Sequence, residues 1–177
     1  ASEVTMLELT AAYASFANGG YGVWPYAIKE IRDGQGRVIY KREGGGPGRI
    51  ETPQKIAAMN QMLTAVIERG TGKNAKINRP AAGKSGTTQN YRDAWFIGYT
   101  AERVAAVWVG NDDGSSMNKV TGGGLPARMW KNLMVSAHNG RTVKSLPTAV
   151  TLPKIEKFEP SKNKGTWQII KNIFGGD

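Results

Sequence analysis

Two nearly uninterrupted apolar segments, residues 94–99 and 104–109, constrain the fold more than any other feature of this chain. Strands that are apolar along their whole length suit the centre of a sheet that is covered on both faces. The connections between these segments and the preceding residues 81–88 are short enough for antiparallel hairpins. We therefore predict a three-stranded antiparallel meander over these residues.

Segments with helical spacing of apolar residues lie before and after the meander. Thr5-Met6-Leu7-Glu8 is a capping-box pattern, and each helical segment ends at a glycine signal. Two later segments begin with a proline in the first turn. Helices before and after an antiparallel sheet in the sequence predict an α+β fold. The predicted helices are Thr5 to about Ala17, Thr52 to about Arg69, and Pro126 to about Asn139.

Two regions are predicted to lie outside this core. Short apolar runs flank Asp33-Gly34-Gln35-Gly36, which predicts a peripheral hairpin between about residues 26 and 40. Residues 141–177 are basic, contain prolines and show little periodicity, so we expect a largely extended, mobile tail there. The chain is therefore divided into a domain over residues 1–140 and a tail over residues 141–177.

Composition excludes several kinds of site. The 177 residues include no cysteine and one histidine, so a disulfide framework, a cysteine nucleophile and a multi-histidine metal site are excluded, and no cofactor is expected. The formal charge of +10 favours an anionic partner. Between Glu68 and Asp93 the chain has no acidic residue but six basic ones and several glycines, which indicates an anion-binding loop and strand. The basic residues are Arg69, Lys73, Lys76, Arg79, Lys84 and Arg92.

The most informative stretch begins at Lys84-Ser85-Gly86 and ends with Asp93-Ala94-Trp95-Phe96-Ile97-Gly98. Lys-Thr/Ser-Gly on a strand is a motif of the serine acyl-transferases that include penicillin-binding proteins and class A β-lactamases. The long form resembles the transpeptidase domain of class A, bifunctional penicillin-binding proteins, especially the penicillin-binding protein 1A family. The resemblance covers residues 2 to about 138, and further matching segments occur in family order. They include Ala12-Tyr13, Phe16-Ala17-Asn18-Gly19-Gly20, Arg69-Gly70-Thr71-Gly72, Val107-Trp108-Val109-Gly110-Asn111-Asp112, Gly122-Gly123 and Trp130-Lys131.

The resemblance implies a role for each residue of the strand. The substrate would be a peptidoglycan stem peptide ending in D-Ala-D-Ala, or a β-lactam in its place, and its carboxylate needs a cation and hydroxyl donors. Lys84 would supply the cation, while Ser85 and Thr87 would supply the hydroxyls. Gly86 would let the acyl group approach the backbone, and the N–H of Thr87 would form half of the oxyanion hole. Thr88 is a further candidate for substrate binding, with a structural role equally open.

The nucleophile of such an enzyme is not found ahead of this strand. The family places the motifs Ser-x-x-Lys and Ser-x-Asn before Lys-Thr/Ser-Gly, and no such pair precedes Lys84. Ser116-Met117-Asn118-Lys119 matches both patterns, but it follows the meander in a glycine-rich loop. We therefore interpret it as a chance match. We expect the C-terminal half of a transpeptidase domain that is inactive alone. The N-terminal half, another chain or a homo-oligomer would complete the sheet. The resemblance implies that the chain acts on the periplasmic side of a bacterial inner membrane, with the membrane anchor and the glycosyltransferase domain elsewhere in the full protein.

Two other functions stay open at this level. A serine β-lactamase-like hydrolase shares the Lys-Thr/Ser-Gly motif, although the long match to residue 98 disfavours it. A basic nucleic-acid-binding module would need exposed aromatic residues among the basic ones, whereas Trp95, Phe96, Trp108 and Trp130 are predicted core residues, so no nucleic acid is expected. Arg92 and Asp93 are predicted to pair near the hairpin. His138 is predicted to cap the C-terminal end of the last helix.

Overall fold

The computed structural model describes residues 4–148, and these residues form an α+β fold, as predicted. The helices and strands lie close to their predicted positions, and two short 3₁₀ turns precede and follow the first strand of the main sheet. The helices are α1 (Met6–Ala17), α2 (Pro53–Glu68) and α3 (Leu125–Ala137). The strands are β1 (Glu30–Arg32), β2 (Val38–Lys41), β3 (Ala82–Thr87), β4 (Asp93–Tyr99) and β5 (Val104–Gly110), and the 3₁₀ turns are Lys73–Ala75 and Gln89–Tyr91.

The predicted meander is confirmed. Its strand order is β3-β4-β5, and both pairs are antiparallel. Lys84 is paired with Ile97 across β3 and β4, and Trp95 is paired with Trp108 across β4 and β5. The outer edges of β3 and β5 have no strand partner among residues 4–148.

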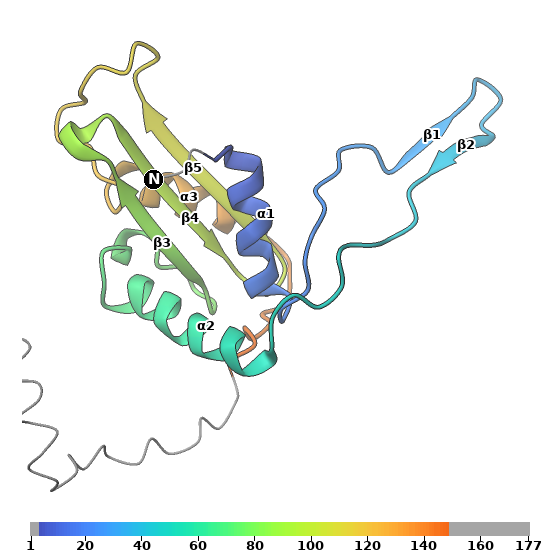
Figure 1. Ribbon diagram of the computed structural model, residues 1–177, viewed down its shortest axis with the longest axis horizontal. Coiled ribbons are helices and arrows are strands. Elements are labelled where there is room, and N and C mark those ends of the chain that lie inside the picture. The colour runs from blue at the N-terminus through green and yellow to red at the C-terminus, as the bar shows by residue number, and fades with distance from the viewer. Residues whose placement is uncertain (1–3, 149–177) are drawn as a thin grey trace, which may run out of the picture.

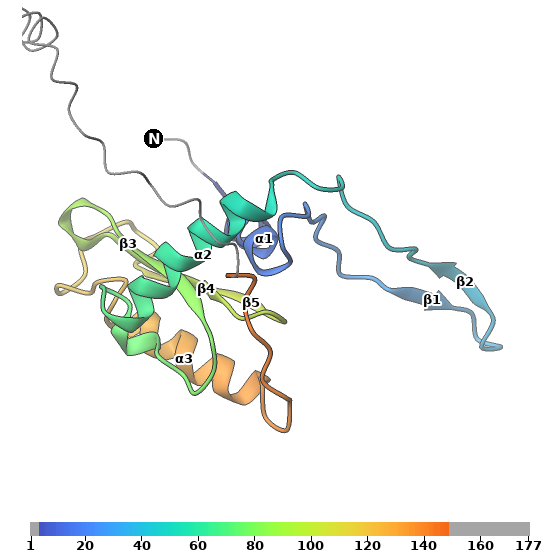
Figure 2. The same ribbon diagram turned by 90° about the horizontal axis from the view of Figure 1, so that it is seen from below.

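Helices cover both faces of the sheet. Figure 1 shows α1 in front of β4 and β5, with α3 behind them, and Figure 2 shows the same layers from below. On the α3 face, Phe96 and Trp130 are fully buried with their rings 5.4 Å apart. The Trp130 indole N–H lies 3.1 Å from the carbonyl oxygens of both Gly98 and Ala105, which ties α3 to the two strands. A Cβ at Gly98 would lie 2.8 Å from the Trp130 ring, so this close approach requires glycine.

A buried amide joins α1 and α2 to the sheet on the other face. Asn60 of α2 is fully buried, and its Nδ2 donates to the carbonyls of Phe16 and Pro147 at 3.1 and 3.0 Å. The Tyr99 hydroxyl donates to Asn60 Oδ1 at 2.5 Å. Burial raises the pKa of the Tyr99 hydroxyl, so it stays a neutral donor. One side chain therefore connects α1, α2, β4 and the segment that follows α3.

The predicted peripheral hairpin is also confirmed. Strands β1 and β2 pair around Asp33–Gly36 at the end of an arm that projects from the body in Figures 1 and 2. Arg37 forms an ion pair with Asp33 at 2.6 Å and helps to close the turn. Apolar side chains of the arm are exposed, among them Trp24, Ile39 and Tyr40.

The predictions for four aromatic residues and for the Arg92–Asp93 pair have different outcomes. Phe96 and Trp130 are core residues as predicted, but the predicted core positions of Trp95 and Trp108 are wrong. Trp108 is 36% exposed and Trp95 is only half-buried, because the two rings pack against each other, 6.4 Å apart, and belong to neither buried cluster. The predicted pairing of Arg92 with Asp93 is wrong as well, since Asp93 accepts hydrogen bonds from Thr88 and Trp108 instead.

The end of α3 agrees with the predicted capping role of His138. Its backbone N–H lies 3.1 Å from the carbonyl of Met134, and its ring is buried. Residues 141–148 form no helix or strand, but Leu146 is buried against Tyr99, so the chain is anchored here. The rest of the predicted tail, residues 149–177, lies outside the described residues. Among residues 4–148, no helix is long and apolar enough to cross a bilayer, and no cluster of acidic, histidine or cysteine side chains is suited to a metal ion.

Candidate active site

Four of the five predicted site residues, Lys84 to Thr87, lie on β3 at the edge of the sheet, and Thr88 directly follows the strand. The first residues of the strand are covered by α2, because Leu63 packs against Ala82. Beyond them, Lys84 is exposed, Ser85 and Gly86 are half-buried, and Thr87 is exposed. The pattern of apolar burial followed by polar exposure therefore places the Lys-Ser-Gly motif where the strand leaves the core.

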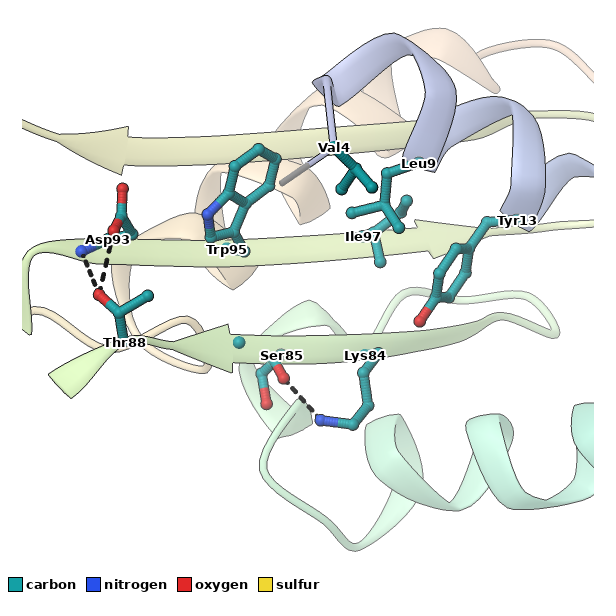
Figure 3. A pocket seen from close by; sticks show the side chains of 10 residues that line it. Val4, Leu9, Tyr13, Lys84, Ser85, Thr88, Asp93, Trp95 and Ile97 are labelled. Atoms are coloured by element: carbon teal, nitrogen blue, oxygen red, sulfur yellow. Dashed lines mark hydrogen bonds between the residues drawn. The ribbon is translucent and has the colours of Figure 1, made fainter. Parts of the chain in front are cut away.

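This part of β3 forms one wall of an open cavity of about 640 Å³. Figure 3 shows the other wall, where side chains from α1 and the residues before it point toward Trp95 and Ile97 of β4. The lining is polar along β3 and at Asp93, the first residue of β4, and mostly apolar along α1 and the rest of β4. It comprises Val4, Leu9, Tyr13, Lys84, Ser85, Gly86, Thr88, Asp93, Trp95 and Ile97.

Lys84 is the cation of this cavity. Its ammonium group donates to the carbonyl oxygen of Ser85 at 2.7 Å, which holds it beside the motif (Figure 3). An ammonium group has three protons, so the others are available to an anion. Lys84 takes part in none of the ion pairs found among residues 4–148.

The Ser85 hydroxyl has a partner on the turn that follows α2. Its Oγ lies 2.6 Å from Oγ1 of Thr71, and either oxygen is able to donate. Two hydroxyls that share one hydrogen bond leave one proton for a third group. This pair therefore provides one hydroxyl donor beside Lys84.

The Thr87 hydroxyl accepts a hydrogen bond from the backbone N–H of Gly122 at 3.0 Å. Its own proton is not used in this contact and is able to reach an acceptor. A Cβ at Gly122 would lie 2.1 Å from the carbonyl oxygen of Trp95 and 2.3 Å from that of Gly86. Only glycine lets this loop approach β3 closely enough to hold Thr87.

Thr88 is engaged within the protein. Its hydroxyl donates to Asp93 Oδ2 at 3.1 Å and accepts from the Asp93 backbone N–H at 2.9 Å. The Trp108 indole N–H donates to the other Asp93 oxygen at 2.9 Å. Of the four residues predicted to bind substrate, Thr88 is thus the one whose side chain closes the β3–β4 turn.

Gly86 lines the cavity, and a Cβ there would meet only the Cβ of Trp95 at 3.5 Å, an ordinary contact. Inside the protein there is room for a side chain at this position. Glycine at this position leaves open the cavity space that a side chain would fill.

Ser116 lies away from these residues. It occurs in the loop between β5 and α3, outside any helix, and it does not line the cavity. The adjacent Met117 donates its backbone N–H to the carbonyl of Tyr91, which attaches this loop to the β3–β4 turn. No helical turn presents Lys119 to Ser116, in agreement with the interpretation of the pattern as a chance match.

Sequence reasoning missed two residues that shape the site, Thr71 and Gly122. Both belong to segments that matched the family pattern, Arg69–Gly72 and Gly122–Gly123. The sequence pattern did not predict that Thr71 and Gly122 contact β3, because these contacts join residues that are 14 and 35 positions apart in the chain.

Comparisons with known proteins agree with this geometry. The family model described as "Penicillin binding protein transpeptidase domain" matches residues 1–135. Penicillin-binding protein 1A of Aquifex aeolicus is 38% identical over 134 residues, which are 75% of this chain and 18% of that protein. Penicillin-binding protein 4 of Bacillus subtilis is 32% identical over 136 residues, 76% of this chain and 22% of that protein.

Solved structures show the same relation. The penicillin-binding protein PonA1 from Mycobacterium tuberculosis superposes with a TM-score of 0.70 at 26% identity, over 85% of this chain and 45% of that one. Penicillin-binding protein A from the same organism, solved as an imipenem acyl-enzyme complex, superposes with a TM-score of 0.63 at 25% identity, over 76% of this chain and 31% of that one. The chain spans about a fifth of the length of the curated relatives it matches.

Proposed function

The chain belongs to the penicillin-binding protein transpeptidase family, and we propose that it supplies the carboxylate-binding side of a peptidoglycan D,D-transpeptidase. One observation carries this proposal: Lys84 and Ser85 line an open cavity at the edge of the sheet, and Thr87 follows them on the same strand. A cation flanked by hydroxyl donors suits the carboxylate of a stem peptide that ends in D-Ala-D-Ala.

The chemistry we propose is serine acyl transfer. A serine hydroxyl attacks the carbonyl of the penultimate D-Ala, the C–N bond to the terminal D-Ala breaks, and the released amine takes up a proton. The amine of a second stem peptide then attacks the ester and restores the serine. In the resemblance that guides this proposal, the Thr87 N–H is half of the oxyanion hole, and the serine's own N–H is the other half.

The nucleophilic serine and its lysine are assigned to sequence outside these 177 residues. No Ser-x-x-Lys precedes Lys84, and the chain spans about a fifth of its curated relatives. We extend the proposal to a bifunctional enzyme with a glycosyltransferase domain and a membrane anchor, acting on the periplasmic side of a bacterial inner membrane. The partners would be the N-terminal half of the same domain and peptidoglycan stem peptides.

A β-lactam is proposed to occupy the same site. Penicillin-binding protein A from M. tuberculosis has been solved as acyl-enzyme complexes with imipenem and penicillin G. A β-lactam also has a carboxylate near its reactive carbonyl, so Lys84 and Ser85 would bind it as they bind the stem peptide. The similarity to transpeptidases favours this function over a β-lactamase-like hydrolase or a nucleic-acid-binding module.

The proposal is tested with the enzyme that joins this chain to its nucleophilic serine. Fluorescent penicillin should form an adduct that survives denaturing electrophoresis, and Lys84→Ala should slow its formation by roughly ten-fold or more, since the cation is lost. Lys131→Ala, an exposed lysine of α3 away from the cavity, is the matched control and should label like the parent. An enzyme that forms no adduct, or a Lys84→Ala variant that labels at the parent rate, would contradict the proposal.

A further inference from the structure

We infer that Thr71 is a positioning residue for the acylation reaction, because its hydroxyl orients the Ser85 hydroxyl toward the substrate carboxylate. The two oxygens lie 2.6 Å apart. The inference rests on the proposed function, since it assumes that a carboxylate binds beside Ser85. It adds a residue that none of the motif positions on β3 includes.

The backbone around Thr71 is held in place from two sides. Behind it, the N–H of Gly72 donates to the carbonyl of Val66 at 2.9 Å, which ties the turn to the end of α2. In front of it, a Cβ at Gly123 would lie 2.1 Å from the Thr71 carbonyl oxygen, so the glycine loop packs directly on this turn. Asn74 adds a hydrogen bond of 2.7 Å from Nδ2 to the Gly123 carbonyl. The Thr71 hydroxyl is thus placed by a rigid turn.

The direction of the hydroxyl hydrogen bond follows from which oxygen faces the ligand. Ser85 lines the cavity beside Lys84, whereas Thr71 is not among the lining residues. If Ser85 donated to Thr71, Ser85 would have no proton for a carboxylate. Donation from Thr71 to Ser85 leaves the Ser85 proton free, and a hydroxyl that accepts one hydrogen bond is polarised to donate another.

Thr87 is arranged in the same way. Its oxygen accepts a hydrogen bond from the Gly122 N–H, so this contact does not use its proton, although Thr87 itself does not line the cavity. Each of the two hydroxyls next to Gly86 therefore accepts from the protein, Ser85 from a side chain and Thr87 from the backbone. Among these two donors, only the one to Ser85 can be removed by a side-chain substitution.

The test measures second-order acylation rates with a penicillin in the enzyme that carries this chain. Thr71→Val keeps the shape of the side chain but removes the donor, and it should lower the rate by roughly three- to ten-fold, the range expected for one neutral hydrogen bond. Thr71→Ser restores a hydroxyl and should recover the parent rate within about two-fold. Because Thr71 acts through Ser85, the double variant Thr71→Val/Ser85→Ala should be no slower than Ser85→Ala alone.

A second substrate separates positioning from a general structural role. With the methyl ester of the same penicillin, which has no anionic carboxylate, Thr71→Val and the parent should react at the same rate. Equal slowing on the acid and the ester, failure of Thr71→Ser to recover the rate, effects that multiply in the double variant, or an unchanged rate in Thr71→Val would each overturn the inference. If the parent enzyme formed no adduct at all, the proposed function itself would fail, and the role of Thr71 with it.

Discussion

A hydroxyl group binds a ligand only when the protein has not already used both its proton and its lone pairs. The three hydroxyl residues of the motif differ in this respect. Within residues 4–148, the hydroxyls of Ser85 and Thr87 each have one partner, Thr71 and Gly122 respectively, while the hydroxyl of Thr88 both donates to and accepts from Asp93. Two hydroxyls on β3 therefore keep a proton that is able to bind a ligand, whereas the hydroxyl of Thr88, directly after the strand, shapes the turn.

The first prediction concerns Ser85. Threonine keeps a hydroxyl donor at this position and alanine does not, so Ser85→Thr should acylate with penicillin within a few-fold of the parent. Ser85→Ala should be slower by roughly ten- to a hundred-fold, since it loses one charge-assisted hydrogen bond of about 1.5 to 3 kcal/mol. Second-order acylation rates measure both. A fast Ser85→Ala variant would show that Ser85 does not hold the carboxylate.

A second prediction concerns Gly122. Its added Cβ would overlap the carbonyl oxygens of Trp95 and Gly86 at 2.1 and 2.3 Å, so Gly122→Ala must displace the loop and break the hydrogen bond to Thr87. We expect a loss of about 1 to 3 kcal/mol in the free energy of unfolding. Gly34→Ala is the control, because a Cβ there meets nothing within 4 Å. Urea denaturation measures both variants, and equal stabilities would contradict the prediction.

At the scale of elements, local sequence signals predicted where most helices and strands begin and end. The features that the sequence did not predict depend on contacts between residues far apart in the chain. The capping box at Thr5 and Glu8 is present as predicted, and the meander follows its apolar runs. Trp108 was misjudged because its burial depends on which distant side chains pack on it, and the apolar run of β5 does not reveal these contacts. The site was located correctly by the motif on β3, but Thr71 and Gly122 reach it through loops whose paths no local pattern describes.

The capping box of α1 leads to a third prediction, on pH. Hydrogen bonds from the backbone N–H and hydroxyl of Thr5 lower the pKa of Glu8 below its ordinary value of 4.5. A depressed pKa means that Glu8 stabilises the folded state above this value and that the stabilisation is lost as the pH falls through the folded-state pKa. Glu8→Gln should therefore lose less stability on acidification than the parent.

Urea denaturation of both proteins at neutral pH and well below pH 4.5 checks this. Other carboxyl groups with lowered pKa values, such as Asp33 and Glu102, titrate in both proteins and cancel in the comparison. Identical pH dependence in the parent and in Glu8→Gln would show that the capping hydrogen bond to Glu8 does not contribute.

At the scale of the whole molecule, the sheet is open beside β5. This strand has no partner on its outer edge among the described residues, and an unpaired edge is a template for another strand. Next to it, Leu133 of α3 is 51% exposed and forms a shallow groove with Val104 and Ala105. The formal charge of +10 opposes contact between two copies, but salt at physiological strength screens this repulsion beyond about 8 Å.

We therefore predict that the isolated chain self-associates through β5 and the adjacent face of α3. Sedimentation across a range of concentrations should show dimers or larger species at moderate salt, and fewer of them at low salt, where repulsion is stronger.

Leu133→Lys should weaken association without unfolding the chain, because the side chain is exposed and a buried interface would have to desolvate the new charge. Val135→Lys, which alters an exposed side chain on a different face of the same helix, should associate like the parent. A chain that stays monomeric at every concentration, or equal effects of the two lysines, would show that this edge is not the contact.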